Sequence, residues 1–424
     1  MKKIVLSLAV PLVMYAHTLP ELFSALKSHS QTKADEIVVK KSGVQEDLVY
    51  SKLYPKVNLF ASYDNYSTPT GMLPVPPDTL VGLVKDPAKP TQPFAYNVYK
   101  TGANFSMPLF VKSIYTTAKK VKALQKSARA KKHINLLKHE ALIVGANANF
   151  SYLDSLLKAL HVKKESLKET EKTTQIKVDN GRAPASALYK INDALNQVAI
   201  AKNNIALQKK KLISTIQTYT GIVLDVPVAM YEQNSFTKGA MKSLQPLVEK
   251  VRADRLGIQA EKENLYPTLA AHGSYAFSTA KAYNNGHDAN ERYGNVGIVL
   301  NIPLFAMDSY ANIKLSEIEL HSSEIALEKL SDELSSEAKM LEDSLPLLDN
   351  SLKLYKHSVE NKKKLLSIAK VSYNSGRLDT EEYLRYEDDV VLEEANLYKT
   401  KATKWQTLMQ LAVIYANNIE EMVK

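Results

Sequence analysis

Two patterns of hydrophobic and polar residues alternate along the chain, and each occurs twice. Apolar and polar positions alternate with period two in stretches near 56–67 and 96–107, and again near 268–279 and 292–302. This alternation is typical of strands with one apolar and one polar face. After each pair of stretches the pattern changes to long segments rich in Lys, Glu, Ala, Ser and Leu, with almost no Pro or Gly. Such segments predict very long helices.

Each long helix is expected to end in a turn and to be followed by a helix that runs back. Gly181 and Gly376 stand at these turns and are natural helix stops. The predicted hairpins therefore cover 113–220 and 307–417. Two shorter helices, 19–52 and 242–265, are expected to end before the Pro of a Leu-Tyr-Pro sequence.

Short sequences recur in the same order in both halves of the chain, which indicates an internal duplication. The matching pairs are LYPKVNLFASYDNYST and LYPTLAAHGSYAFSTA, NFSMPLF and VLNIPLF, and VDNGR and YNSGR. The last two pairs share one sequence offset. We interpret 17–221 and 242–424 as two structural repeats joined by an equatorial linker over 222–241. Each long helix is matched in length by two shorter ones, so the linker and the chain termini are expected to lie at one level.

The first 16 residues have the layout of a cleavable secretory signal. Lys2 and Lys3 precede an apolar stretch of ten residues, and small Ala16 comes before the polar sequence that follows. Ten apolar residues are too few to cross a bilayer as a helix. The sequence therefore predicts a signal peptide over 1–16; the alternative is an amphipathic N-terminal helix.

Composition excludes several classes of chemistry. The chain has no Cys, which rules out a disulfide scaffold, a thiolate metal site and a Cys nucleophile. The nine His residues are scattered, and no Gly-rich phosphate loop or nucleophile elbow occurs. We expect no enzyme activity, no metal and no cofactor. The net charge is +10, but the Lys runs lie among Glu on predicted helices, which favours solvated helix faces over nucleic-acid binding.

Four strands are too few to form a closed membrane barrel by themselves. The sequence contains no other stretch long and apolar enough for a membrane helix, so the exported chain is either soluble or a membrane β-barrel. Membrane barrels have at least eight strands and leave no open edge. Three copies would supply twelve strands, although this argument does not fix the number of copies.

The duplicated order of strand, strand, Pro-Leu-Phe and long helical hairpin resembles the TolC family of outer-membrane efflux proteins over essentially the whole chain after the signal. The resemblance implies an α+β membrane protein, a homotrimer with a 12-stranded β-barrel in outer-membrane lipid and a periplasmic α-helical barrel. It implies an exit duct that works with a periplasmic adaptor (membrane fusion) protein and an inner-membrane transporter, in efflux or type I secretion. The alternative from another class is an exported coiled-coil structural or adaptor protein.

The resemblance also implies a periplasmic gate just after the second turn. Glu382 matches the first acidic position of the family's ring, and Asp379 and Glu381 keep the region acidic. Arg385 replaces the second acidic residue and is expected to neutralise the ring or to pair with Glu381 or Glu382. Without the family, these acids would be interpreted as charges that complement a helix N-terminus.

Two further groups of residues follow from the resemblance. Tyr373 matches a position that holds the mouth shut, while Arg377 lies one residue before the family's latch arginine. The two turns are expected to contact the adaptor. The residues assigned to that contact are Gly181, Arg182, Gly376 and Arg377.

Overall fold

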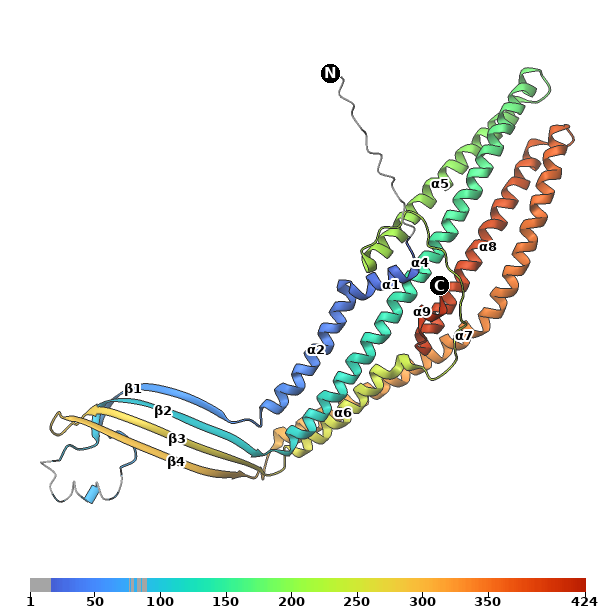
Figure 1. The fold of residues 1–424 in the computed structure, drawn as a ribbon. Coiled ribbons are helices and arrows are strands. Elements are labelled where there is room, and N and C mark those ends of the chain that lie inside the picture. The colour runs from blue at the N-terminus through green and yellow to red at the C-terminus, as the bar shows by residue number, and fades with distance from the viewer. Residues whose placement is uncertain (1–16, 76, 78–79, 82–84, 86–89) are drawn as a thin grey trace, which may run out of the picture. The chain divides into compact units, whose positions relative to one another are not determined.

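The computed structural model describes residues 17–75, 77, 80, 81, 85 and 90–424, and Figure 1 shows its elements. The predicted signal peptide lies outside the described residues. The helices and strands, in chain order, are α1 (Leu19–Ser28), α2 (Ser30–Ser51), β1 (Lys56–Gly71), β2 (Phe94–Phe110), α4 (Lys112–Asp179), α5 (Ala185–Thr220), η1 (Lys242–Leu244), α6 (Gln245–Glu263), β3 (Thr268–Lys281), β4 (Asp288–Asn301), α7 (Met307–Asn374), α8 (Thr380–Tyr415) and α9 (Ile419–Met422).

The chain divides into two compact units, and each unit takes residues from both sequence repeats. Unit 1 contains the described residues through Val39, then Ala128–Pro246 and Leu327–Lys424. Unit 2 contains Lys40–Ser127 and Leu247–Ala326. Because the cuts fall inside α4 and α7, the two long helices contribute to both units. The repeats are therefore interleaved in space and do not fold as separate halves.

The strands form one antiparallel sheet in unit 2, in the order β1-β2-β3-β4. Leu59 is opposite Ala103, Ala103 is opposite Tyr275, and Tyr275 is opposite Gly294. β2 continues past the expected end of its strand and includes Pro108, where the register with β3 shifts. A bulge accommodates the missing Pro N–H, which is why the strand does not stop there.

This register places the alternating residues of all four strands on two faces of the sheet, which differ in polarity. One face carries Leu59, Val296 and Ile298, which are 84%, 89% and 67% exposed in the single chain. The opposite face pairs Asn58 with Asn104 and Asn104 with Ser274. The reverse face also carries Phe60 and the buried residues Val98 and Ala280. A long sheet with an exposed apolar face and a mainly polar reverse face is thus a product of the period-two pattern.

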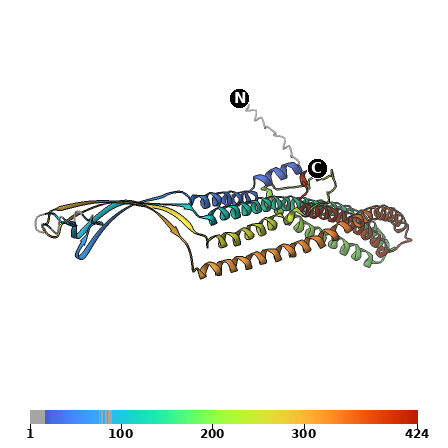
Figure 2. The ribbon, with the colours of Figure 1, turned by 90° about the horizontal axis from the view of Figure 1, so that it is seen from below.

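The helical part of unit 2 is a layer of four helices that run side by side in the order α2, α4, α6 and α7 (Figures 1 and 2). Thr116 of α4 donates a hydrogen bond of 2.5 Å to the buried carboxylate of Glu263 on α6. Arg255, which lies earlier on α6 than Glu263, forms an ion pair of 2.8 Å with Glu324 of α7. Among the helices that the structure describes, none combines the length and apolarity needed to cross a membrane.

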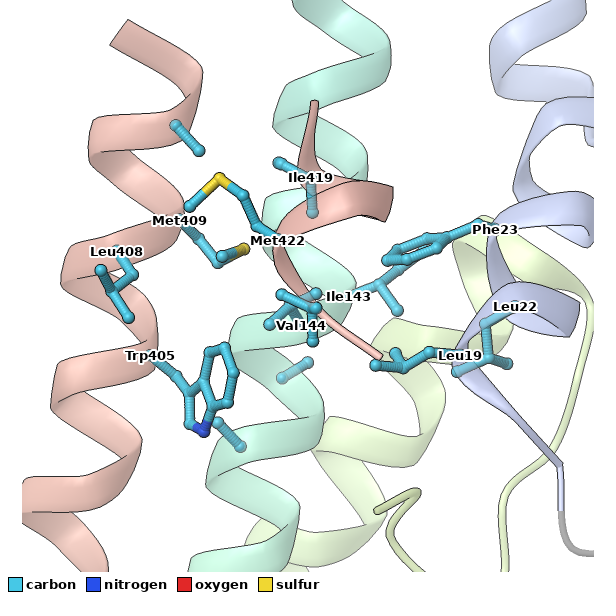
Figure 3. Packing of buried hydrophobic residues seen from close by; sticks show 14 of the residues in the cluster. Leu19, Leu22, Phe23, Ile143, Val144, Trp405, Leu408, Met409, Ile419 and Met422 are labelled. Atoms are coloured by element: carbon cyan, nitrogen blue, oxygen red, sulfur yellow. The ribbon is translucent and has the colours of Figure 1, made fainter. Parts of the chain in front are cut away.

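The largest hydrophobic core lies in unit 1, where α1, α4, α8 and α9 meet (Figure 3). Phe23 and Leu22 of α1 are buried in it, together with Trp405 of α8. A capping box between Thr18 and Glu21 fixes the start of α1 and so directs its apolar face into the core. Trp405, the single Trp of the sequence, therefore packs between helices.

The segment that links the two repeats pairs with the C-terminal residues. Tyr231 and Lys424 exchange backbone hydrogen bonds of 2.8 and 3.0 Å, and Gln233 donates to the carbonyl of Met422 at 2.9 Å. Asn147 of α4 anchors the same segment by bonding both backbone groups of Val228. The matched helix lengths predicted that the linker and the chain termini would lie at one level, and these hydrogen bonds place the C-terminal residues beside the linker.

The predicted N-terminal helix 19–52 is wrong in one respect, because it is broken at His29. The backbone of His29 is extended, and the hydroxyl of Thr32 donates 2.8 Å to the carbonyl of Leu26. This side-chain bond replaces a helical one and lets α1 turn into the core. The opposite occurs at Pro346, where α7 continues without ending although Pro lacks the N–H donor.

Glu140 on α4 is an acid buried in unit 1 with only 3% of its surface exposed. Burial, together with the nearby charge of Glu420, raises its pKa from 4.5 to about 7, and Lys27 opposes the change. The folded chain therefore binds this proton more tightly than the unfolded chain. Between pH 4.5 and about 7, stability is expected to fall as pH rises, by up to about 3 kcal/mol.

We expect Glu140→Gln to flatten this part of the stability profile and to raise the melting temperature most at pH 8. The measurement is thermal unfolding followed by circular dichroism at pH 5 and pH 8. Glu360→Gln, which changes an exposed acid on α7, is the matched control. An unchanged pH dependence in Glu140→Gln would show that other groups produce the slope.

Candidate functional site

The candidate site is the end of unit 1 where both helical hairpins turn. The two turns are the same motif: Arg182 N–H donates to Lys177 O at 2.7 Å, and Arg377 N–H donates to Ser372 O at 2.9 Å. Gly181 and Gly376 precede these arginines with φ of 67° and 76°. Both long helices thus end in a Schellman motif, in which glycine adopts the left-handed backbone without steric cost. Both arginine side chains are exposed.

Tyr373, at the end of α7, is buried and connects the second hairpin to the first. Its hydroxyl shares a hydrogen bond of 2.7 Å with Thr174 of α4. Lys177 of α4 lies over the Tyr373 ring at 4.7 Å and donates to the Tyr373 carbonyl at 3.2 Å. The Tyr373 ring also stacks on Tyr383 of α8, with centroids 4.8 Å apart. Tyr373 is therefore held by both neighbouring helices.

A buried polar network continues from Tyr383 along α8. Tyr383 donates a hydrogen bond of 2.7 Å to Glu387, and Ser166 of α4 donates to the same carboxylate. Burial raises the pKa of Tyr383 to about 12 and raises the pKa of Glu387 as well, although the hydroxyl donors and Lys163 act against the latter shift. The two hairpins thus share a hydrogen-bonded core at their ends.

The acids predicted for the gate lie on the first turn of α8, and each has its own partner. The Asp379 carboxylate accepts the Glu382 N–H at 2.8 Å as the helix cap, which agrees with the helix-terminus interpretation for this residue. Glu381 pairs with Lys190 of α5 at 2.6 Å, and this hydrogen bond raises the pKa of Lys190. Glu382 lies 3.7 Å from Arg385. Glu381 and Glu382 were the two expected partners of Arg385, and in the structure Arg385 pairs with Glu382.

Sequence reasoning missed the residues of the first hairpin that contact the second hairpin near this turn. Besides Lys190, these include Lys163, which pairs with Asp388, and Glu169, which accepts from Lys370 at 3.0 Å. A signal for part of this contact was present in α4. Its polar residues Ser166, Thr170 and Thr174 recur every four positions, which places them on one face.

The site contains no arrangement suited to a metal. Across the part of the chain that the structure describes, no three His, Asp or Glu side chains come together as potential ligands. The cluster consists instead of paired charges, buried hydroxyls and stacked rings at a junction of two hairpins.

Comparisons with known proteins give matches only at the level of structure. No protein-family model matches the chain, and no curated protein matches its sequence. A membrane protein from Pseudomonas aeruginosa has a TM-score of 0.78 at 15% identity, covering 94% of this chain and 90% of that one. The CmeC outer membrane channel of Campylobacter jejuni has a TM-score of 0.76 at 16% identity, covering 93% and 84%.

The open-state MtrE outer membrane channel of Neisseria gonorrhoeae is also similar. It has a TM-score of 0.73 at 14% identity, covering 94% of this chain and 88% of that one. These matches extend over nearly the full length of both partners, although few residues are identical. They confirm the resemblance derived from the duplicated sequence pattern: the chain has the fold of the TolC-like outer-membrane channels.

Proposed function

We propose that this protein is an outer-membrane exit duct of a tripartite efflux or type I secretion system, passing small molecules or polypeptides from the periplasm to the outside. The observation that carries the proposal is the sheet of unit 2, whose one face is apolar and exposed while the other is polar. In membrane barrels the apolar face contacts lipid and the polar face lines a water-filled lumen. The fold of outer-membrane channels supports the same assignment.

The duct requires several copies of the chain. The sheet ends at β1 and β4, and unpaired strand edges are not tolerated in lipid. Three copies joined edge to edge form a closed 12-stranded barrel, within the known range of sizes. The edge helix α7 supports this assembly, because exposed apolar residues recur on it seven positions apart: Ile318 and Ile325 in unit 2, and Leu347 and Leu354 in unit 1. Such a repeat is the seam of a coiled coil, and we assign it to the next copy.

The hairpin ends form the periplasmic gate of this duct. Asp379, Glu381 and Glu382 from three copies surround the mouth, and Arg385 compensates part of their charge. Tyr373 holds the mouth shut, supported by its contacts with Thr174 and Tyr383. Arg377 belongs to the same turn and assists the closure.

The turns themselves contact the periplasmic adaptor, which connects the duct to an inner-membrane transporter. Gly181 and Gly376 shape the two turns, and Arg182 and Arg377 present their guanidinium groups to the partner. Within the described residues, neither guanidinium has an ion-pair partner in its own chain, which supports an outward role. Transport of this kind involves no cofactor, no nucleic acid and no covalent chemistry.

Single-channel recording of the purified protein in a planar bilayer tests the proposal. We expect an oligomer of three chains with a small, cation-biased conductance, because a ring of carboxylates near a narrow axis favours cations. Glu382→Gln is expected to reduce the cation preference, measured from the reversal potential in a salt gradient. It removes three ring charges from the assembly and leaves Arg385 uncompensated.

Glu360→Gln, an equivalent change at an exposed acid of α7 away from the turn, should keep the wild-type selectivity. Protein that is inserted in the bilayer but carries no current would contradict the duct and favour the exported coiled-coil structural or adaptor protein. Current with unchanged selectivity in Glu382→Gln would keep the duct and place its selective ring elsewhere.

A further inference from the structure

Unit 1 contains a groove of about 840 Å³ between α4, α7 and α8, next to the buried network of Tyr383. Its walls are partly apolar, formed by Val162, Leu366 and Val390, and Glu387 lies at the wall where α4 and α8 meet. The groove has the size of a small-molecule site and combines apolar walls with a few polar groups.

The other charged side chains that line this groove all form ion pairs. The pairs that cross between helices are Lys163 with Asp388, Lys363 with Glu394 at 2.6 Å, and Lys370 with Glu169 at 3.0 Å. Lys158 and Glu165 pair along α4, with Asp154 and Lys168 respectively. Among the described residues of the lining, Glu387 is the one charged group without an ion-pair partner.

Glu387 is also the most buried of these charges, with 2% of its surface exposed. One carboxylate oxygen accepts hydrogen bonds from Tyr383 and Ser166. The other oxygen, Oε2, is buried and has no donor among the described residues. A buried carboxylate oxygen without a partner is unfavourable, and the neighbouring lysines are already engaged by other acids. A cation bound in the groove beside Oε2 would supply the partner that this oxygen has not found among the described residues.

We propose that this groove binds a small amphiphilic organic cation, with its ammonium group on Glu387 Oε2 and its apolar part against Val162, Leu366 and Val390. A metal ion fits the groove less well, because hard cations need several oxygen ligands and the described lining residues offer one carboxylate outside an ion pair. An amine needs only one charge-assisted hydrogen bond and gains from apolar burial. The site is independent of the duct proposed above, because it depends only on contacts within unit 1.

Dansylcadaverine, a primary amine with an aromatic body, is a suitable probe. We expect the full-length protein in nanodiscs to bind it, measured by fluorescence anisotropy against empty nanodiscs. Glu387→Gln keeps the shape of the side chain but removes its charge, and should weaken binding at least about tenfold. The N-acetylated probe, which lacks the ammonium charge, should lose affinity to the same extent. Glu360→Gln, which alters an exposed acid of α7 outside the groove, should bind as the wild type does.

A second pair of variants tests the site without touching the buried network. Val162 is 70% exposed, so substitution there does not disturb the core. Val162→Lys adds a tethered ammonium to the groove and should weaken probe binding at least about tenfold, whereas Val162→Gln should retain it. Equal binding by wild type, Glu387→Gln and Val162→Lys would overturn the proposal. Equal binding of the acetylated probe would also overturn it, because the groove would then be only an apolar surface.

Discussion

Replacing Tyr373 with alanine is expected to raise the single-channel conductance of the reconstituted protein. Tyr373 stacks on Tyr383, bonds Thr174 and lies under Lys177, so it joins α7 to both α4 and α8. Truncating a buried aromatic residue removes about 3–5 kcal/mol of packing. If opening separates the hairpins, this loss falls mainly on the closed state. The ratio of closed to open channels should then fall at least about 100-fold, because each 1.4 kcal/mol corresponds to a factor of ten.

Two further variants show which part of Tyr373 matters. Tyr373→Phe keeps the stacked ring and loses only the bond to Thr174, so its conductance should lie between wild type and Tyr373→Ala. Tyr189→Ala removes an exposed tyrosine of α5 near the turn of the first hairpin and should leave conductance unchanged. A conductance of Tyr373→Ala equal to that of the wild type would mean that the hairpins are held together elsewhere.

Phe23→Ala is expected to cause the largest loss of stability in unit 1, about 3–5 kcal/mol. Phe23 lies in the core formed by α1, α4, α8 and α9 (Figure 3). Two helices of this core, α4 and α8, are long and make contacts elsewhere along their length, so we expect the cavity that the missing ring leaves to stay largely open. Denaturant unfolding followed by the fluorescence of Trp405, the only tryptophan and part of the same core, measures this loss directly.

Phe305→Ala is the matched control, because Phe305 is 87% exposed in the connection after β4. Its free energy of unfolding should stay within about 0.5 kcal/mol of the wild-type value. If Phe23→Ala also unfolded like the wild type, α1 would not be part of the cooperative core, and its burial would contribute nothing measurable to stability.

Much of the fold follows from patterns along the chain, because periodicity and helix breakers act locally. Alternation over β1 predicted its apolar face, and pairing through Leu59, Ala103 and Tyr275 extends that face over the sheet. Gly181 and Gly376 predicted the hairpin turns because only glycine adopts their left-handed backbone easily. Local signals failed at His29, where a hydroxyl replaced a helical hydrogen bond, and at Pro108, where a bulge absorbed the proline.

The sequence by itself determined the strands, the long helices, their duplication and the acidic turn at the start of α8. Only the tertiary structure decided that Thr174 meets Tyr373, that Lys190 meets Glu381, and that Glu387 is buried with one oxygen unpaired. The physical reason is that residue type indicates whether a helix face is polar, but not which residue of another helix lies opposite. That register is set by packing between segments about 200 residues apart in the chain, and it emerges only when both hairpins are in place.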